Sequence, residues 1–189
     1  MKDFIFDSKG MDELFKEVYC SPDFFCFPCF SENNTEEIKK TYLLGINEFH
    51  KANFEDAIRF FSQLVTPNGG LEIAGYWLGQ CYYHQSRYEE MINVYTDLLS
   101  KFPQWCLVEY HLGLAFYLTA QDQNAIKCFE HLLQKKNSNV FTYIYLAEIY
   151  FRHGKLLEAI NTVKEGLTLN QKAKNLKKAL DFYTDVSKP

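Results

Sequence analysis

The most constraining feature of this sequence is a pattern that returns every 34 residues. A leucine followed by a small residue occurs four times at that spacing, in Leu44-Gly45, Leu78-Gly79, Leu112-Gly113 and Leu146-Ala147. Each pair is followed, always at the same distance, by Ala57-Ile58, Met91-Ile92, Ala125-Ile126 or Ala159-Ile160. A period of this length without insertions predicts a stack of similar helical units, because each unit is one supersecondary element.

The residue types within the period predict two helices per unit. Counted from unit starts at Ile38, Glu72, Cys106 and Val140, the small residues fall at the eighth and twentieth places, where two helices can cross closely. Large residues fill the twenty-fourth place and mostly leucines the twenty-seventh. The predicted helices span 38–51, 54–65, 72–85, 88–101, 106–119, 122–135, 140–153 and 156–169. Such units bury part of their surface only by stacking on their neighbours.

Two further segments flank the repeats. Residues 172–186 place Leu176, Ala179, Leu180 and Tyr183 at helical spacing, which predicts a capping helix within the segment 172–189. Residues 1–37 form a predicted N-terminal arm. It begins with a short amphipathic helix and continues as an aromatic, proline-interrupted extended stretch, CSPDFFCFPCFSENN.

This pattern resembles the tetratricopeptide repeat. The resemblance implies an all-α fold, a right-handed α-solenoid of four helix-turn-helix units (38–71, 72–105, 106–139 and 140–171) with a C-terminal capping helix. Three residues depart from the pattern. Met91 replaces a small residue, Gly166 replaces a leucine, and Glu48 stands where the other units have an aromatic ring. We expect these departures to affect local packing only.

Composition narrows the class of partner. The 189 residues carry a net charge of −4 with a pI near 5.7, so the sequence shows no basic patch of the kind that binds nucleic acid. No run approaches the roughly 20 apolar residues of a membrane span. The first residues lack the apolar core of a signal peptide. We therefore expect a cytoplasmic protein without a membrane span or a nucleic-acid partner.

The resemblance also implies a concave groove lined by the first helix of each unit. In this chain the lining is aromatic and nearly uncharged, which suits anchoring of an apolar peptide segment of a partner protein. The predicted groove residues are Tyr42, Phe49, Tyr76, Trp77, Gln80, Tyr83, His84, Tyr110, His111, Tyr117, Phe141 and Tyr145. The predicted function is that of a chaperone, adaptor or scaffold.

Chaperone-binding members of the family hold the C-terminal carboxylate of Hsp70 or Hsp90 with a clamp of cations and asparagines. The matching places here hold Tyr42, Ile46, Trp77, Leu107 and His111, so that ligand is not expected. A weaker resemblance, in size, acidity and groove character, is to the secretion chaperones built from the same repeat. Many such folds dimerise, and the sequence does not decide between a monomer and a homodimer.

A rival reading is a structural subunit of a larger assembly, with the groove filled by the chain's own N-terminal arm. A catalytic or metal-binding role has little support in the sequence. Cys26 and Cys29 form a Cys-x-x-Cys pair without the setting of a redox motif, and together with Cys20 they fall one ligand short of a zinc site. Three other cysteines lie in predicted helices, where we expect small buried thiols. We expect no catalytic residue, metal or cofactor, and therefore no enzyme.

Overall fold

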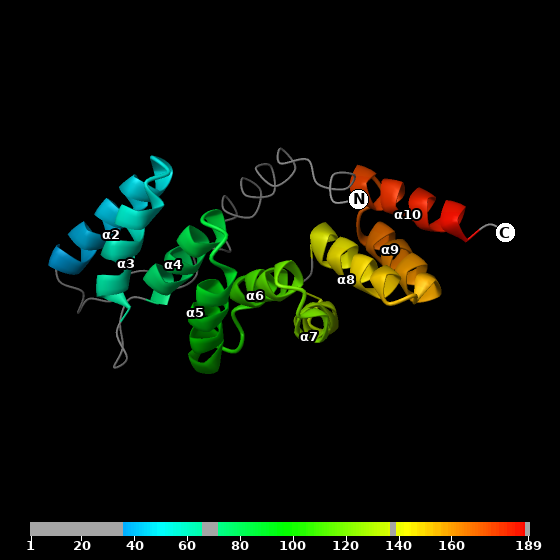
Figure 1. Cartoon of the computed structure of the whole chain (residues 1–189), viewed down its shortest axis with the longest axis horizontal. Coiled ribbons are helices and arrows are strands. Elements are labelled where there is room, and N and C mark those ends of the chain that lie inside the picture. Colours follow the sequence, from blue (N-terminus) through cyan, green and yellow to red (C-terminus); the bar gives the residue numbers. More distant parts are fainter. Residues whose placement is uncertain (1–35, 66–71, 137–138, 188–189) are drawn as a thin grey trace.

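The computed structural model describes residues 36–65, 72–136 and 139–187, and this part of the chain consists of helices joined by short turns (Figure 1). The helices are α2 (Glu36–His50), α3 (Phe54–Leu64), α4 (Glu72–His84), α5 (Tyr88–Lys101), α6 (Cys106–Leu118), α7 (Asp122–Gln134), α8 (Val140–Arg152), α9 (Leu156–Leu169) and α10 (Lys174–Val186). Every predicted helix from residue 38 onward is present, with ends within two residues of the prediction. The all-α fold class is confirmed.

The helices are arranged as consecutive pairs that stack on one another. The pairs are α2 with α3, α4 with α5, α6 with α7, and α8 with α9, and each pair also contacts the next (Figure 1). The first helices additionally contact one another, α2 with α4 and α6 with α8. This geometry places the first helices on the inner side of a solenoid and the second helices on its outer side. The division into arm, repeats and cap at the predicted boundaries stays a prediction, and the predicted arm helix lies outside the described residues.

The two helices of a pair cross where the pattern places its small residues. A Cβ atom added to Gly79 would lie 2.3 Å from Cε1 of Tyr95, a distance that no real side chain tolerates. Tyr95 is fully buried at this crossing. The last pair has Ala147 in place of the glycine and the smaller Val163 in place of the ring, so the crossing is filled by another combination. Close packing of the interior explains why the two places change together.

The turn inside each pair has the same backbone conformation in all four units. The fifteenth residue has a positive φ in each case, at Ala52 (62°), Ser86 (58°), Ala120 (58°) and Gly154 (73°). The next residue donates its backbone N–H to a carbonyl of the preceding turn of helix, as from Gln121 to Phe116 at 2.8 Å. This left-handed helix end stops the first helix and reverses the chain.

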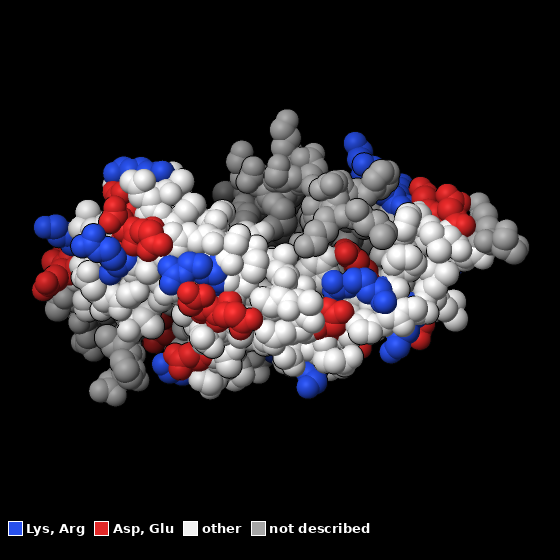
Figure 2. All heavy atoms as spheres, viewed as in Figure 1, with Lys and Arg blue, Asp and Glu red and all other residues white. Residues whose placement is uncertain are grey.

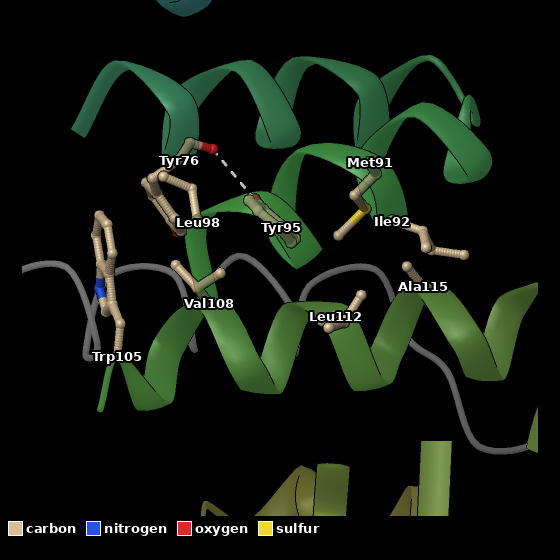
Figure 3. Packing of buried hydrophobic residues seen from close by; sticks show 9 residues of the cluster. All are labelled: Tyr76, Met91, Ile92, Tyr95, Leu98, Trp105, Val108, Leu112 and Ala115. Carbon is tan, nitrogen blue, oxygen red and sulfur yellow. Dashed lines mark hydrogen bonds between the residues drawn. The ribbon is translucent and has the colours of Figure 1, made fainter. Parts of the chain in front are cut away.

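Buried side chains between neighbouring pairs form the core. The cluster in Figure 3 joins α4, α5 and α6 and contains Tyr76, Met91, Ile92, Tyr95, Leu98, Trp105, Val108, Leu112 and Ala115. Met91, one of the departures from the pattern, is fully buried within it, so the larger side chain is accommodated by its neighbours. At the C-terminal end, α10 packs on α9 and α8 and buries Leu176, Ala179 and Tyr183.

The three described cysteines are free thiols. Cys81 is buried as expected, whereas Cys106 and Cys128 are only partly buried. Cys20, Cys26 and Cys29 lie outside the described residues. None of the helices described for residues 36–187 is long and apolar enough to cross a membrane.

Candidate functional site

The residues predicted to line the groove lie on the four first helices, α2, α4, α6 and α8, as the repeat requires. Their exposure differs. Tyr76, Gln80, Tyr110, His111 and Tyr145 are buried. The half-buried members are Tyr42, Phe49, Trp77, Tyr83, Tyr117 and Phe141, and His84 is exposed. Their role in peptide binding stays a prediction.

At the N-terminal end of the array, Trp77 joins the first two units. Its indole Nε1 donates a hydrogen bond of 3.0 Å to the hydroxyl of Tyr42. The ring of Phe49 contacts Trp77 edge-on, with centroids 5.0 Å apart, and also lies 5.4 Å from the ring of His84. The structure therefore brings together four of the predicted residues in one aromatic group.

In the second and third units the predicted residues take part in a buried polar network. The Nε2 group of Gln80 donates to the hydroxyl of Tyr95 at 2.7 Å, and that hydroxyl donates to the backbone carbonyl of Tyr76 at 3.1 Å. The hydroxyl of Tyr76 lies 3.4 Å from Nε2 of His111. Burial lowers the pKa of His111 to about 3, so this imidazole is neutral at physiological pH.

The C-terminal half carries a second aromatic group around Tyr117. Its ring centroid lies 4.9 Å from that of Tyr145, and the guanidinium of Arg152 stands over its face at 4.8 Å. Burial raises the pKa of Tyr117, and a hydrogen bond to Glu148 acts in the same direction. Burial also raises the pKa of Tyr145 well above its usual value. These phenols are neutral donors at physiological pH.

The predicted groove set leaves out Glu148 and Phe151, although both occupy first-helix places that the repeat assigns to the groove. Glu148 forms a hydrogen bond with Tyr117. Phe151 contacts Phe182 and Tyr183 of the capping helix, with ring centroids 5.5 Å and 5.1 Å apart. Tyr183 is one of the residues at helical spacing in the predicted capping helix, and Phe182 precedes it. The predicted groove set covers only the four units and ends before α10, which explains why Phe182 and Tyr183 are absent from it.

The site offers little for covalent or metal chemistry within the described residues. No group of three or more His, Cys, Asp or Glu side chains in residues 36–65, 72–136 and 139–187 is arranged to hold a metal ion. Burial raises the pKa of both Cys81 and Cys128 to about 12, so neither forms the reactive thiolate at physiological pH. The face in Figure 2 carries acidic and basic side chains interspersed rather than gathered by sign.

Comparison with known proteins agrees with this architecture. A family model described as "Tetratricopeptide repeat" matches residues 74–104, which span α4 and α5. No curated protein matches the chain significantly by sequence.

Solved structures of MamA have the same arrangement of helices. MamA AMB-1 superposes with a TM-score of 0.68 at 17% identity, over 79% of this chain and 82% of that one. MamA 41-end from Desulfovibrio magneticus RS-1 superposes with a TM-score of 0.73 at 15% identity, over 80% of this chain and 86% of that one. At such identities the likeness shows a shared fold.

Proposed function

Because the chain is a tetratricopeptide-repeat protein, we propose that it binds an apolar segment of a partner protein on the inner side of its helical stack. It then acts as a chaperone, adaptor or scaffold and not as an enzyme. Stacked repeats present an extended surface suited to such binding. The weaker resemblance to secretion chaperones belongs to the same proposal, as does a cytoplasmic location, which the three free thiols of the described residues support.

The observation that carries the proposal is the run of half-buried rings along the first helices. Phe49 and Trp77 belong to the first and second units, and Tyr83, Tyr117 and Phe141 continue the run through the second, third and fourth. Rings that are partly covered by the protein retain a face for a ligand, and aromatic anchors of this kind dominate binding energy at interfaces. Cations are scarce among these places, which supports an apolar ligand over the carboxylate of Hsp70 or Hsp90.

A second function, that of a structural subunit in a larger assembly, is favoured by the burial of Tyr76, Tyr110 and Tyr145. Side chains that are this deeply buried stabilise the fold, and their truncation would lower the free energy of unfolding. The notion that the N-terminal arm fills the groove concerns residues outside the described structure and stays part of this alternative. A homodimer is compatible with either function.

The test uses the half-buried rings, because their truncation leaves most of the core intact. Peptides that bind the full-length protein are selected from a displayed random library, and their affinities are measured by fluorescence anisotropy. Trp77→Ala and Tyr117→Ala are compared with Leu157→Ala and Leu169→Ala, which truncate apolar side chains that are 68% and 65% exposed on α9. Far-ultraviolet circular dichroism and urea denaturation monitor the fold of every variant.

The two functions predict different outcomes. Peptide capture requires that the selected peptides be apolar, that Trp77→Ala and Tyr117→Ala bind them at least about tenfold more weakly, and that the α9 variants bind normally. If no peptide is selected, or if binding is lost only together with the helical fold, the structural subunit is supported instead.

A further inference from the structure

The pair α2 and α3 lies at one end of the stack, and no described helix precedes α2 (Figure 1). In every later unit the first helix packs against the second helix of the unit before it: α3 contacts α4, α5 contacts α6 and α7 contacts α8. As a result, the leucine before the small residue is 5%, 7% and 2% exposed in the second, third and fourth units. Its counterpart in the first unit, Leu44, is 38% exposed.

Leu44 belongs to an exposed stripe along α2. The members of the stripe recur at intervals of three and four residues, which places them on one face of the helix. They are Lys40, Leu43, Leu44 and Asn47. Leu43 is 62% exposed. The stripe is therefore apolar in the middle and polar at both ends, and it fits a covering segment with the same distribution.

The N-terminal arm contains a segment of this kind. Residues 1–35 precede α2 and lie outside the described residues. The amphipathic helix predicted at the start of the arm has its apolar side chains at intervals of three and four residues, at Met11, Leu14, Phe15 and Val18. On a helical projection, Asp12 and Glu17 border this apolar face on its two sides. A helix this short is marginal in water and requires a surface to pack on.

The charges of the two surfaces are complementary. Lys39 is already paired with Glu36 at 3.0 Å. Lys40 is exposed and has no ion-pair partner within the described residues. An acidic residue at either border of the arm helix can therefore pair with Lys40 when the apolar face lies on the two leucines.

The small area of the stripe favours a segment of the same chain over a second copy. Two leucine side chains supply only a small part of the roughly 800 Å² that each partner buries in a stable interface between separate molecules. A covalently joined segment does not need that area, because the linker, residues 19–35, holds it near α2 at high effective concentration.

We propose that the N-terminal arm packs on the exposed stripe of α2 and closes this end of the stack. The apolar face around Phe15 covers Leu43 and Leu44, and Asp12 or Glu17 pairs with Lys40. This inference does not rest on the proposed peptide binding. It differs from the alternative in which the arm fills the groove, because an arm on the end of the stack leaves the inner side open to a ligand.

Photochemical cross-linking in the full-length protein tests the location of the arm. Leu43 is replaced with p-benzoylphenylalanine, the protein is irradiated, and peptide mass spectrometry locates the product. Cross-links to residues 11–18 within a monomer are expected. The same probe at Leu157 on α9, a position that is also exposed, is the control and should give no product with the arm.

Three results of this experiment would overturn the proposal. One is the absence of arm products from position 43. Another is a product of dimer size, which would assign the stripe to a second copy. The third comes from the same probe at Leu118, an exposed residue of α6 on the inner side: if it captures the arm instead, the arm lies in the groove.

A charge reversal tests the pairing. In the protein with the probe at position 43, Lys40→Glu is expected to lower the yield of arm product about two- to fivefold, as suits an exposed ion pair. Adding Asp12→Lys or Glu17→Lys is expected to restore the yield. Lys164→Glu on α9 is the matched control and should leave the yield unchanged. An unchanged yield in Lys40→Glu, or a loss that neither reversal restores, contradicts the pairing.

Urea denaturation of the full-length protein tests the apolar contact without a probe. Phe15→Ala and Leu44→Ala are each expected to lower the unfolding midpoint, and the double variant should lower it by less than the sum of the two shifts. Phe15→Ala combined with Leu157→Ala is the control, for which additive shifts are expected. Additive shifts for Phe15→Ala and Leu44→Ala would overturn the contact between the arm and α2.

Discussion

The ring of Tyr143 lies against Gly166, so closely that a Cβ atom on Gly166 would come within 2.8 Å of Cγ of Tyr143. The same two places in the second unit hold the opposite combination, Gly75 and Leu98, where a Cβ on the glycine would lie 3.1 Å from Leu98 Cδ2. The replacement of a leucine by Gly166 is therefore half of a size exchange. Tyr143 supplies the volume that the twenty-seventh place lacks.

This exchange predicts strong coupling between the two residues. Gly166→Leu alone should lower the free energy of unfolding by about 1–3 kcal/mol, because the added side chain has no space beside Tyr143. The double variant Tyr143→Gly with Gly166→Leu recreates the combination of the second unit. Urea denaturation should show it less destabilised than the two single variants together, and strictly additive effects would refute the exchange.

The left-handed turn residue predicts that glycine is stabilising at this place in both of two units. Ala120 has φ of 58° and Gly154 has φ of 73°, at the same place of the turn. An L-residue in this conformation is strained by roughly 1–2 kcal/mol. Glycine relieves the strain at an entropic cost of about 0.4–1 kcal/mol in the unfolded chain. Ala120→Gly should therefore raise the midpoint of thermal unfolding and Gly154→Ala should lower it. Shifts of the same sign would show that the turns differ.

The buried imidazole of His111 predicts a loss of stability in acid. Its pKa is lowered to about 3 in the folded protein, while an unfolded histidine titrates near 6.5. Between these values the unfolded chain binds more protons than the folded one. Stability is therefore complete above about pH 6.5 and falls as the pH drops toward 3, by up to about 1.4 kcal/mol per pH unit for this group.

The control for this titration is His111→Leu, which removes the titrating group and keeps an apolar side chain of moderate size. Urea denaturation between pH 7 and pH 4.5 should give a flatter dependence for this variant than for the wild-type protein. Parallel curves would assign the acid sensitivity to other groups.

The burial of Cys81 and the partial burial of Cys128 predict that both thiols are protected from alkylation. Burial raises the pKa of Cys81 and of Cys128 to about 12, and the thiolate is the reactive form. Iodoacetamide at pH 8 should leave both unmodified in the native protein and label both in urea, as measured by peptide mass spectrometry. Rapid labelling of Cys81 under native conditions would mean that α4 opens locally far below the global unfolding free energy.

The repeat period alone was enough to predict most of the fold. Leu78-Gly79 and its counterparts recur once in each two-helix unit. The positions of the helices and their close crossing at Gly79 therefore follow from the residue types. For the turns, the sequence predicted only where the helices end and not the backbone conformation between them. Alanine and serine do not favour a left-handed conformation, which Ala52, Ser86 and Ala120 nevertheless adopt. This conformation follows from the helix-end hydrogen bonds that each turn makes.

The candidate site depended more on tertiary structure. The sequence by itself determined on which helix each predicted groove residue lies, because its place in the repeat falls within the first helix of the unit. Only the packed structure decided how deeply each is buried, since that depends on neighbouring units and on α10. Tyr145 and Trp77 share one place in the repeat, yet the first is 2% exposed and the second half-buried. The contact between the rings of Tyr117 on α6 and Tyr145 on α8 likewise joins two helices that are separated along the chain, and no local pattern encodes it.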